Sequence, residues 1–324
     1  MEIITKTLLD NMSVGDIIKG AVFIQDYQVL QTRNGSDYID GVLCAGKPIS
    51  FKIWTSPDGL VEKLKSEDYR GCVCNIYGKL ESYNGLSYLI VKNTCDKVNE
   101  PIDIGLFLPI KYDKDAFLSA LKVLLSRNLS PEGIQVANKL LFDNEKIFNR
   151  FVTEFCAKSH HDNCLNGLLV HTYKIVDLLC FICSRYGYLS TFPSRDMSIP
   201  MYRTDLLIIG GLIHDWGKIE EMQYGVYQPN SAVTHRVFGI EMLFPFKDYI
   251  ISVYDEKWYY DLVSIISQHH GEFGEDCKTI YSYVVHQVDM LDTMLTGLSD
   301  TITNNLNVDN SGNFVYVDKK RLNL

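Results

Sequence analysis

The sequence contains no histidine in its first 159 residues, whereas eight histidines follow between His160 and His286. It also lacks an excess of positive charge, because 31 Lys and Arg residues face 40 Asp and Glu residues, for a formal net charge of −9. This balance excludes a protein that coats nucleic acid by charge alone, and an anionic substrate would need a local positive site. The uneven distribution of histidine indicates that the chain has two chemically different parts.

Long hydrophobic runs and a pair of C-x-x-C motifs are also missing. The N-terminal segment MEIITKTLLDNMSVGD has no basic region followed by a long apolar run. No later apolar stretch reaches membrane-spanning length without a polar or charged interruption. We therefore expect a soluble, cytoplasmic protein with no membrane partner. The nine cysteines are odd in number, and Cys180 and Cys183 stand alone in an apolar, helix-like segment. They are expected to be reduced core thiols.

The first part of the chain has the pattern of a small β-barrel. The whole sequence has 324 residues, 46% of them hydrophobic, which is enough for two domains with their own cores. Residues 1–100 contain five runs rich in Val, Ile, Tyr and Phe between turn sequences. Asn84-Gly85 signals a hairpin between the last two runs. A helical insertion near residues 59–65 separates the third run from the fourth, the order expected of an OB-fold. We predict an OB-fold nucleic-acid-binding domain over residues 1–100.

Aromatic and basic residues in these runs predict a surface that stacks bases. The candidates for nucleic-acid contact are Trp54, Lys52, Tyr83 and Lys79, and Phe51 belongs to the same aromatic set. Aromatic rings bind the bases of single strands with little sequence preference. Taken singly, each of these aromatic residues is more often part of a core or a cross-strand pair. The residues favour a binding face without establishing one.

After Pro101 the spacing of apolar residues becomes helical. We predict an all-α domain over residues 101–300. Residues 301–324 are polar and rich in turn formers before a short strand-like run, FVYV. We interpret this last segment as a C-terminal tail that acts as a flap or a partner strand.

The run LLIIGGLIHDWGK places His214 beside Asp215 in an apolar, helical segment. Burying an unpaired carboxylate in such a segment is costly, so the pair needs a partner. A metal ion is the leading candidate. His161-Asp162 is a second pair of the same kind, but it lies in a polar, turn-prone segment and is the poorer metal site.

Further candidate ligands lie on apolar helical faces elsewhere in this part: His171, His235, His269, His270 and Asp289. Inward-facing residues from separate helices can converge on one metal site. A single histidine on an apolar face is more often a hydrogen-bonded core residue, but the ordered set favours metal binding. Imidazole and carboxylate ligands suit Mn, Fe, Co or Zn, and no cysteine in this part matches a thiolate site.

The ordered set resembles the HD superfamily of metal-dependent phosphohydrolases, in which an H is followed by HD, further His and a late D. The H-D-x-G-K extension is matched by His214, Asp215, Gly217 and Lys218. The presence of His235, His269 and His270 is similar to the two-metal branch of that superfamily. Together with the predicted barrel, the chain resembles the YhaM-type 3′-to-5′ exoribonucleases over roughly residues 15–295, which implies an OB-fold joined to an HD-type helical domain.

The resemblance implies two divalent metal ions, with Mn²⁺ expected and Fe, Co, Ni or Zn also compatible. One ion would be held by His171, His214, Asp215 and Asp289, and the second by His235, His269 and His270. Asp215 would bridge the two ions.

Three residues have implied catalytic roles: Asp215, Lys218 and His161. Lys218 could hold a phosphate oxygen, although a solvated lysine near a helix end is the alternative reading. His161 could contact the substrate or protonate the leaving oxygen. His286 and Asp292 are expected to support the ligands or to lie on the surface.

Three functions remain open at this point. The first is a metal-dependent 3′-to-5′ exonuclease that hydrolyses single-stranded nucleic acid, RNA favoured over DNA. The second is an HD-type phosphohydrolase of a nucleotide or cyclic nucleotide, with the OB-fold as a regulatory or assembly module. The third, a binding protein with structural metals, is disfavoured because such sites seldom need seven ligands. The aromatic and basic residues of the barrel favour a strand substrate. A homo-oligomer is a further open expectation, since another subunit's barrel could complete the entrance to the active site.

Overall fold

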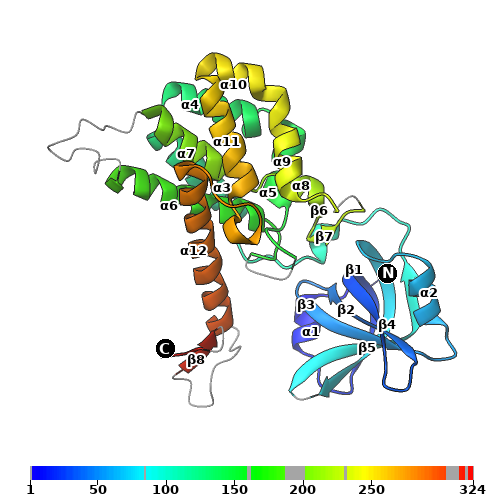
Figure 1. Ribbon diagram of the computed structural model, residues 1–324. Helices are drawn as coiled ribbons and strands as arrows, with labels where there is room; N and C mark the ends of the chain where they lie inside the picture. The colour runs from blue at the N-terminus through cyan, green and yellow to red at the C-terminus, as the bar shows by residue number, and fades with distance from the viewer. Residues whose placement is uncertain are drawn as a thin grey trace. The chain divides into compact units, whose positions relative to one another are not determined.

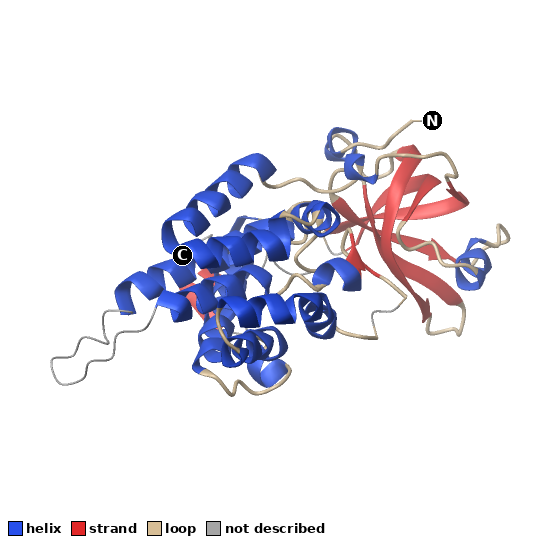
Figure 2. Ribbon diagram, turned by 90° about the horizontal axis from the view of Figure 1, so that it is seen from above, coloured by secondary structure: helices blue, strands red, loops and turns tan. Residues whose placement is uncertain are grey.

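The computed structural model divides into two compact units, which we describe separately. The first comprises Met1–Lys111 with Gln223–Val226, and the second comprises Tyr112–Met222 with Tyr227–Leu324. The structure describes residues 2–83, 85–158, 162–186, 201–229, 232–303, 314–317 and 320–323. Figure 2 shows the strands of the barrel in red and the helices of the second unit in blue. The predicted order of an all-β part followed by a helical part is confirmed.

The first unit contains a closed, OB-like barrel (Figure 1). Its strands are β1 (Ile17–Gln31), β2 (Asp37–Cys44), β3 (Pro48–Trp54), β4 (Cys72–Tyr83) and β5 (Leu86–Lys97). They close in the order β1-β2-β3-β5-β4, with β3 and β5 parallel and the other neighbours antiparallel. Two helices, α1 (Lys6–Asp10) and α2 (Leu60–Ser66), and a 3-10 turn, η1 (Ile104–Leu106), complete the unit. The position of α2 between β3 and β4 is the predicted one.

Alternation along β3 determines which residues the barrel buries. Phe51 and Ile53 lie in the core, whereas Lys52 and Trp54 point outward, because successive side chains of a strand face opposite sides. The interpretation of Phe51 as part of a stacking surface is therefore wrong. Tyr83 pairs with Leu86, which leaves the predicted two-residue turn between β4 and β5. Gly85 has a φ of +80°, and Asn84 lies outside the described residues.

The second unit is a helical bundle around one apolar core. Its principal helices are α3 (Lys114–Asn128), α4 (Pro131–Ala137), α5 (Glu145–Thr153), α6 (Gly167–Tyr186), α7 (Met201–Ile213), α8 (Lys218–Glu221), α9 (His235–Leu243), α10 (Lys247–Val253), α11 (Glu256–Gln268) and α12 (Ile280–Thr303). Shorter elements are a π-helical turn, η2 (Asn138–Phe142), and two 3-10 turns, η4 (Phe244–Phe246) and η5 (Gly271–Phe273). The residues of a short hairpin, β6 (Met222–Gln223) and β7 (Val226–Tyr227), are divided between the two units. Helix α6 packs on α3, α7 and α12, and α11 packs on α7, α9 and α12. These contacts bring the histidine-bearing segments to the centre of the unit.

Helix α6 is the one described helix whose length and composition would allow it to cross a membrane, over Gly167–Arg185. Within that window 56% of the residues are buried inside the protein. Because α6 packs against α3, α5, α7 and α12, its apolar composition is that of a helix packed in a protein core.

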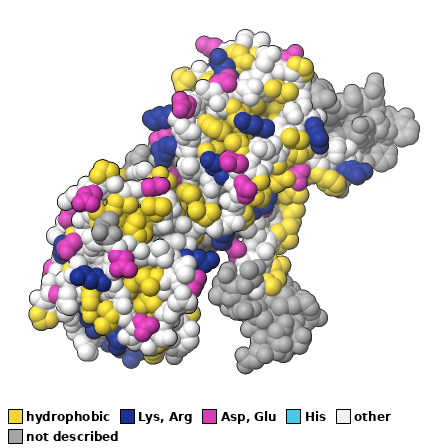
Figure 3. Space-filling view, turned by 180° about the vertical axis from the view of Figure 1, so that it is seen from behind, with side chains coloured by type: hydrophobic (Ala, Val, Ile, Leu, Met, Phe, Trp, Pro, Cys, Tyr) yellow, Lys and Arg dark blue, Asp and Glu magenta, His cyan; other side chains and the backbone are white. Residues whose placement is uncertain are grey.

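The C-terminal segment forms a second small hairpin. The predicted strand FVYV is β8 (Phe314–Val317), and it pairs antiparallel with β9 (Lys320–Asn323). On the face shown in Figure 3, Lys and Arg side chains lie interspersed with Asp, Glu and hydrophobic side chains on the described surface of both units. This mixed surface leaves the recognition of an anion to local sites.

Candidate metal centre

The seven predicted ligands come from three helices and two turns of the second unit. Helix α6 carries His171, α9 begins with His235, and α12 carries Asp289. The pair His214-Asp215 follows the last residue of α7, and the pair His269-His270 follows the last residue of α11. The sequence interpretation placed both pairs within helices. The structure places them just beyond helix ends, where two consecutive side chains can both face the same centre.

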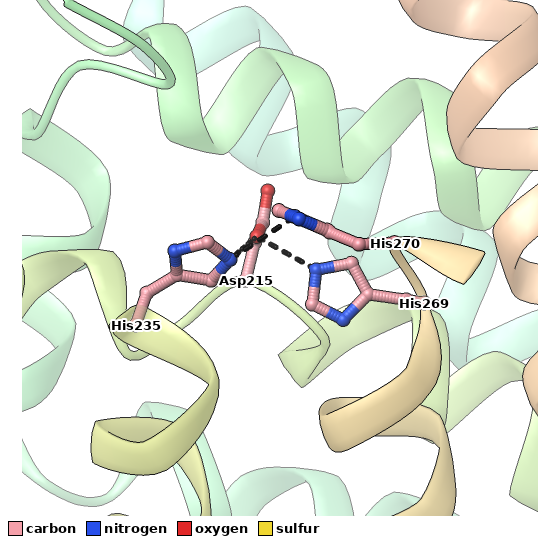
Figure 4. A group of neighbouring side chains, drawn as sticks. All are labelled: Asp215, His235, His269 and His270. Carbon is pink, nitrogen blue, oxygen red and sulfur yellow. Dashed lines mark hydrogen bonds and ion pairs between the residues drawn. The ribbon is translucent and has the colours of Figure 1, made fainter. Parts of the chain in front are cut away.

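Asp215 lies at the middle of the cluster and directs its two carboxylate oxygens to different histidines. Its Oδ2 lies 3.4 Å from His214 Nε2 and 3.6 Å from His171 Nε2. Its Oδ1 lies 3.4 Å from Nε2 of both His235 and His269. Figure 4 shows the imidazoles of His235, His269 and His270 around this carboxylate. One side chain thus joins two ligand groups.

The first group consists of His171, His214 and Asp289, and the second consists of Asp215, His235, His269 and His270. Within each group the candidate ligand atoms lie within 4.8 Å of one another. In the first group His171 Nε2 is 3.2 Å from His214 Nε2 and 3.3 Å from Asp289 Oδ1. In the second, Nε2 of His235 is 3.2 Å from Nε2 of His270. These buried clusters could hold a metal ion.

Two buried atoms in the second group support this conclusion. Asp215 Oδ1 and His269 Nε2 have no hydrogen-bond partner among the residues that the structure describes. Buried polar atoms without a partner are rare because each costs its full desolvation free energy. A cation between these atoms would satisfy both, so the residues present fit a metal ion.

The outer nitrogens of four imidazoles are tied to hydrogen-bond acceptors. The Nδ1 atoms of His214 and His269 lie 2.8 and 2.9 Å from the carbonyl oxygens of Gly211 and Ile266. Those of His171 and His235 lie 2.8 Å from Asp292 Oδ2 and 3.0 Å from Glu221 Oε2. An acceptor at Nδ1 assigns the proton to that nitrogen and leaves the Nε2 lone pair for a metal. All four rings are therefore oriented as ligands.

The electrostatics of the centre favour deprotonated ligands. Burial lowers the pKa of His269 to about 4. Burial, aided by His269, lowers the pKa of His270 to about 3. Burial alone would raise the pKa of the Asp215 carboxyl, but the Lys218 ammonium and His214 outweigh it and hold this pKa well below its usual range. At neutral pH these three groups are in the protonation states that bind metal.

The protonation states of His171 and Asp289 depend on each other. Burial lowers the pKa of His171, but Cys156 and the carboxylates of Asp289 and Asp292 outweigh it and raise that pKa well above its usual value. For Asp289, burial alone would raise the pKa. The hydrogen bond with His171 and the charge of that ring outweigh burial and hold the Asp289 pKa far below its usual range. The two side chains therefore share a proton-dependent interaction that a metal ion at His171 Nε2 would replace.

Lys218 is largely buried at the centre, with 14% of its side chain exposed, and is not a solvated lysine. Its Nζ lies 2.6 Å from Asp215 Oδ2 and 3.6 Å from Cys156 Sγ. Cys156 was not expected here, yet it forms a further candidate ligand group with His171 and Asp215. Burial raises the pKa of the Cys156 thiol, which disfavours the thiolate that metal binding requires. We therefore retain the histidine and carboxylate ligands.

A network of side chains supports His171 from behind. Asp292 accepts hydrogen bonds from Thr296 Oγ1 at 3.1 Å and pairs with Lys174 Nζ at 3.1 Å. Lys174 also pairs with the fully buried Asp162 at 2.7 Å, which accepts a 2.6 Å hydrogen bond from the Tyr112 hydroxyl. Asp162 thus belongs to this network. The predicted catalytic residue His161 lies outside the described residues.

The candidate nucleic-acid residues of the barrel are only partly brought together. Trp54 stacks on Tyr38 with ring centroids 4.8 Å apart. Lys52 Nζ lies 5.5 Å from the Tyr38 ring but is 2.6 Å from Asp40 Oδ1. These contacts follow from the register of β2 and β3, which pairs Tyr38 with Trp54 and Asp40 with Lys52. The surface is aromatic, and its lysine charge is largely balanced.

The other two barrel candidates lie on β4. Lys79 pairs with Glu81 at 3.5 Å, and Tyr83 is exposed at the end of the strand. The described contacts do not place either side chain with Trp54.

Sequence reasoning missed Glu221 as the partner of His235 and Tyr38 as the partner of Trp54. Glu221 lies one turn beyond Lys218 on α8, so its helical spacing from the H-D-x-G-K motif was the available signal. Tyr38 could be found only once the register of β2 and β3 was known. No protein-family model matches the chain, and a search of solved structures finds no significant match.

Replacement of Asp292 by asparagine is expected to weaken metal binding by about 10- to 100-fold, the usual effect of losing a carboxylate behind a histidine ligand. The change keeps the size of the side chain but removes the charge that holds His171 Nδ1. Metal affinity, measured by competition with a chelating dye, tests this expectation. The control is Asp276→Asn, which changes an exposed carboxylate. Equal affinities for the two variants would contradict a supporting role for Asp292.

Proposed function

We propose that the protein is a metal-dependent phosphodiesterase that removes nucleotides from the 3′ end of single-stranded nucleic acid, RNA favoured over DNA. In this proposal the helical unit is an HD-type phosphohydrolase domain of the YhaM-like kind and the barrel is an OB-fold that holds the strand. Two divalent ions, Mn²⁺ in the first instance, would occupy the two ligand groups. The assignment depends on the chemistry of the centre.

The observation that carries the proposal is the division of the Asp215 carboxylate between two ligand groups. Structural metal sites are closed by four ligands around one ion. Here one carboxylate joins the two groups, an arrangement suited to a pair of ions. Such a pair stabilises charge on the attacking and leaving oxygens of an in-line displacement at phosphorus. Phosphate ester hydrolysis is the reaction that uses this chemistry best.

The chain's own residues would bind and orient the phosphate. Lys218 Nζ lies beside Asp215 with its charge retained, because the carboxylate raises the lysine pKa despite burial. Lys218 and Asp215 both line a pocket of about 750 Å³, together with His235, His270 and Asp289. A phosphate in this pocket would face the ligand cluster and a lysine ammonium, which supplies the local positive site that the acidic chain otherwise lacks.

A second candidate function is hydrolysis of a nucleotide or cyclic nucleotide, with the barrel as a regulatory or assembly module. One observation favours it: Lys52, whose Nζ lies 5.5 Å from the Tyr38 ring, is paired with Asp40 at 2.6 Å. A strand-binding groove normally follows the backbone with positive charge. The paired lysine reduces that charge.

A strand assay distinguishes the two functions. We expect 5′-labelled single-stranded RNA, incubated with the protein and Mn²⁺, to shorten into a ladder from its 3′ end, and DNA of the same sequence to shorten more slowly. A chelator should stop both reactions. Intact strands, combined with phosphate release from nucleotides, would contradict the exonuclease and support the second function.

A further inference from the structure

The pocket beside the metal centre has aromatic and cationic walls that the ligand cluster does not explain. In addition to the ligands, the residues lining its 750 Å³ include Tyr227, Phe273 and Arg236. This volume lies within the range of roughly 300–1,000 Å³ that is typical of ligand pockets. It is more than a single phosphate group needs. The additional lining residues therefore indicate which chemical groups a substrate has besides one phosphate.

Phe273 is an exposed apolar ring held close to a metal-ligand candidate. It is 70% exposed and lies in η5, where its backbone N–H donates to the carbonyl oxygen of His270 at 3.1 Å. The preceding turn is fixed by Gly271, whose φ is +54° and which leaves no space for a Cβ beside the His286 ring. The backbone thus fixes Phe273 relative to His270, although the ring itself buries little surface.

Tyr227 gives the pocket a second aromatic ring. It is 48% exposed, and Lys158 Nζ lies 5.5 Å from its ring centroid. Two exposed aromatic rings in the lining of this pocket are suited to a flat, partly apolar group. Nucleobases stack on such rings whatever their identity, because every base has a π face.

Arg236 supplies a positioned cation in the same lining. It follows His235 in the first turn of α9, and its Nη1 donates to the carbonyl oxygen of Ser267 at 2.9 Å. The guanidinium lies against Gly274, where a Cβ would be 2.7 Å from Nη1. Its Nε is buried and has no hydrogen-bond partner among the described residues. Because Arg236 lines the pocket, its guanidinium charge can attract an anionic oxygen there.

We propose that this pocket is a nucleotide subsite, in which Arg236 binds a phosphate group and Phe273 and Tyr227 stack the base. The subsite rests on the proposed phosphodiesterase function and defines its substrate class as a nucleotide unit rather than a simple phosphate ester. A phosphate ester without a base would leave both rings in water. A nucleotide occupies the cation, the rings and the metal-facing wall together.

Equilibrium dialysis with three probes tests the subsite on the intact protein in Mn²⁺: adenosine 5′-monophosphate, ribose 5-phosphate and inorganic phosphate. We expect the adenosine nucleotide to bind about tenfold or more tightly than ribose 5-phosphate, the difference that stacking of one base supplies. Phe273→Ala and Tyr227→Ala should each remove most of that difference and leave ribose 5-phosphate unaffected. Arg236→Gln should weaken all three probes, by about tenfold or more.

The chain offers closely matched controls. Phe244 is 66% exposed in another 3-10 turn, and Tyr260 is 50% exposed with Lys247 Nζ 5.0 Å from its ring. Neither lines the pocket. Phe244→Ala and Tyr260→Ala should bind all three probes as the unaltered protein does, and Phe273→Trp should keep the preference for the adenosine nucleotide.

The outcomes separate the subsite from the proposed function. Equal binding of the adenosine nucleotide and ribose 5-phosphate, or no difference between Phe273→Ala and Phe244→Ala, would overturn the subsite even if strands are degraded. Conversely, a base preference that depends on Phe273, in a protein that hydrolyses neither strands nor nucleotides, would uphold the subsite and overturn the phosphodiesterase.

Discussion

Replacement of Asp215 by alanine is expected to remove both metal ions and to abolish hydrolysis. The two oxygens of this carboxylate face different ligand groups, at 3.4 Å from His214 on one side and 3.4 Å from His235 and His269 on the other. Without the carboxylate, the second group retains only imidazoles, and the first group keeps Asp289 but loses the negative charge that it shares with the second. The loss of activity should exceed the roughly 10²- to 10³-fold that follows removal of one charge-stabilising donor.

Metal content measured by mass spectrometry, together with strand hydrolysis on the same samples, tests this expectation. The unaltered protein should hold two ions per chain and Asp215→Ala none. Asp289→Ala should lose the ion of the first group and retain that of the second. The control is Asp261→Asn, which changes a buried carboxylate of α11 that pairs with Lys257 away from the centre. Hydrolysis by a metal-free Asp215→Ala protein would disprove the metal mechanism.

Replacement of Gly217 by alanine is expected to lower the free energy of unfolding by about 3 kcal/mol or more. A Cβ at this position would overlap the carbonyl oxygen of His235 and lie 2.5 Å from the amide nitrogen of Gly239. Both are backbone atoms of α9, so the neighbour cannot rotate aside, and the cost should reach or exceed the 1–3 kcal/mol usual for overpacking. The glycine of the H-D-x-G-K motif therefore allows α9 to approach the Asp215 turn.

Thermal unfolding followed by circular dichroism measures the effect. For a helical unit of this size, about 1 kcal/mol corresponds to roughly 2–4 °C, so Gly217→Ala should lower the Tm by about 6–12 °C or more. The matched control is Gly297→Ala in α12, where a Cβ meets no atom within 4 Å. That change should raise stability by up to about 1 kcal/mol, because alanine favours a helix over glycine. Similar melting temperatures for the two variants would show that α9 can shift to make room.

The sequence was most informative where a pattern is local. Strand alternation and turn residues predicted five barrel strands with a helix between the third and fourth, since period and turn chemistry are encoded within a few residues. The convergence of the seven candidate ligands was predicted from their inward helical positions. Their division into two groups was implied by a family resemblance, not by spacing, because spacing does not determine which helices pack together.

The features that could not be predicted depend on tertiary packing. Cys156 and Lys218 meet at the centre although 62 positions separate them in the chain. The register of β2 and β3 pairs Lys52 with Asp40, which balances the lysine charge. Arg236 Nε is buried because α9 packs against the segment after α11. The exact helix ends were also missed, because the helical period of α7 continues in the sequence up to the turn that holds Asp215.

If a metal ion satisfies Asp215 Oδ1 and His269 Nε2, the two buried atoms without a hydrogen-bond partner, the abundance of this protein depends on metal supply. An ion that binds only the folded chain stabilises it by RT ln(1 + [L]/Kd), about 2.7 kcal/mol when the free ion is at 100 times its Kd. A fall in the free ion concentration therefore increases the unfolded fraction that proteases remove. Under the proposed function, cells short of the metal would lose the protein itself as well as its activity.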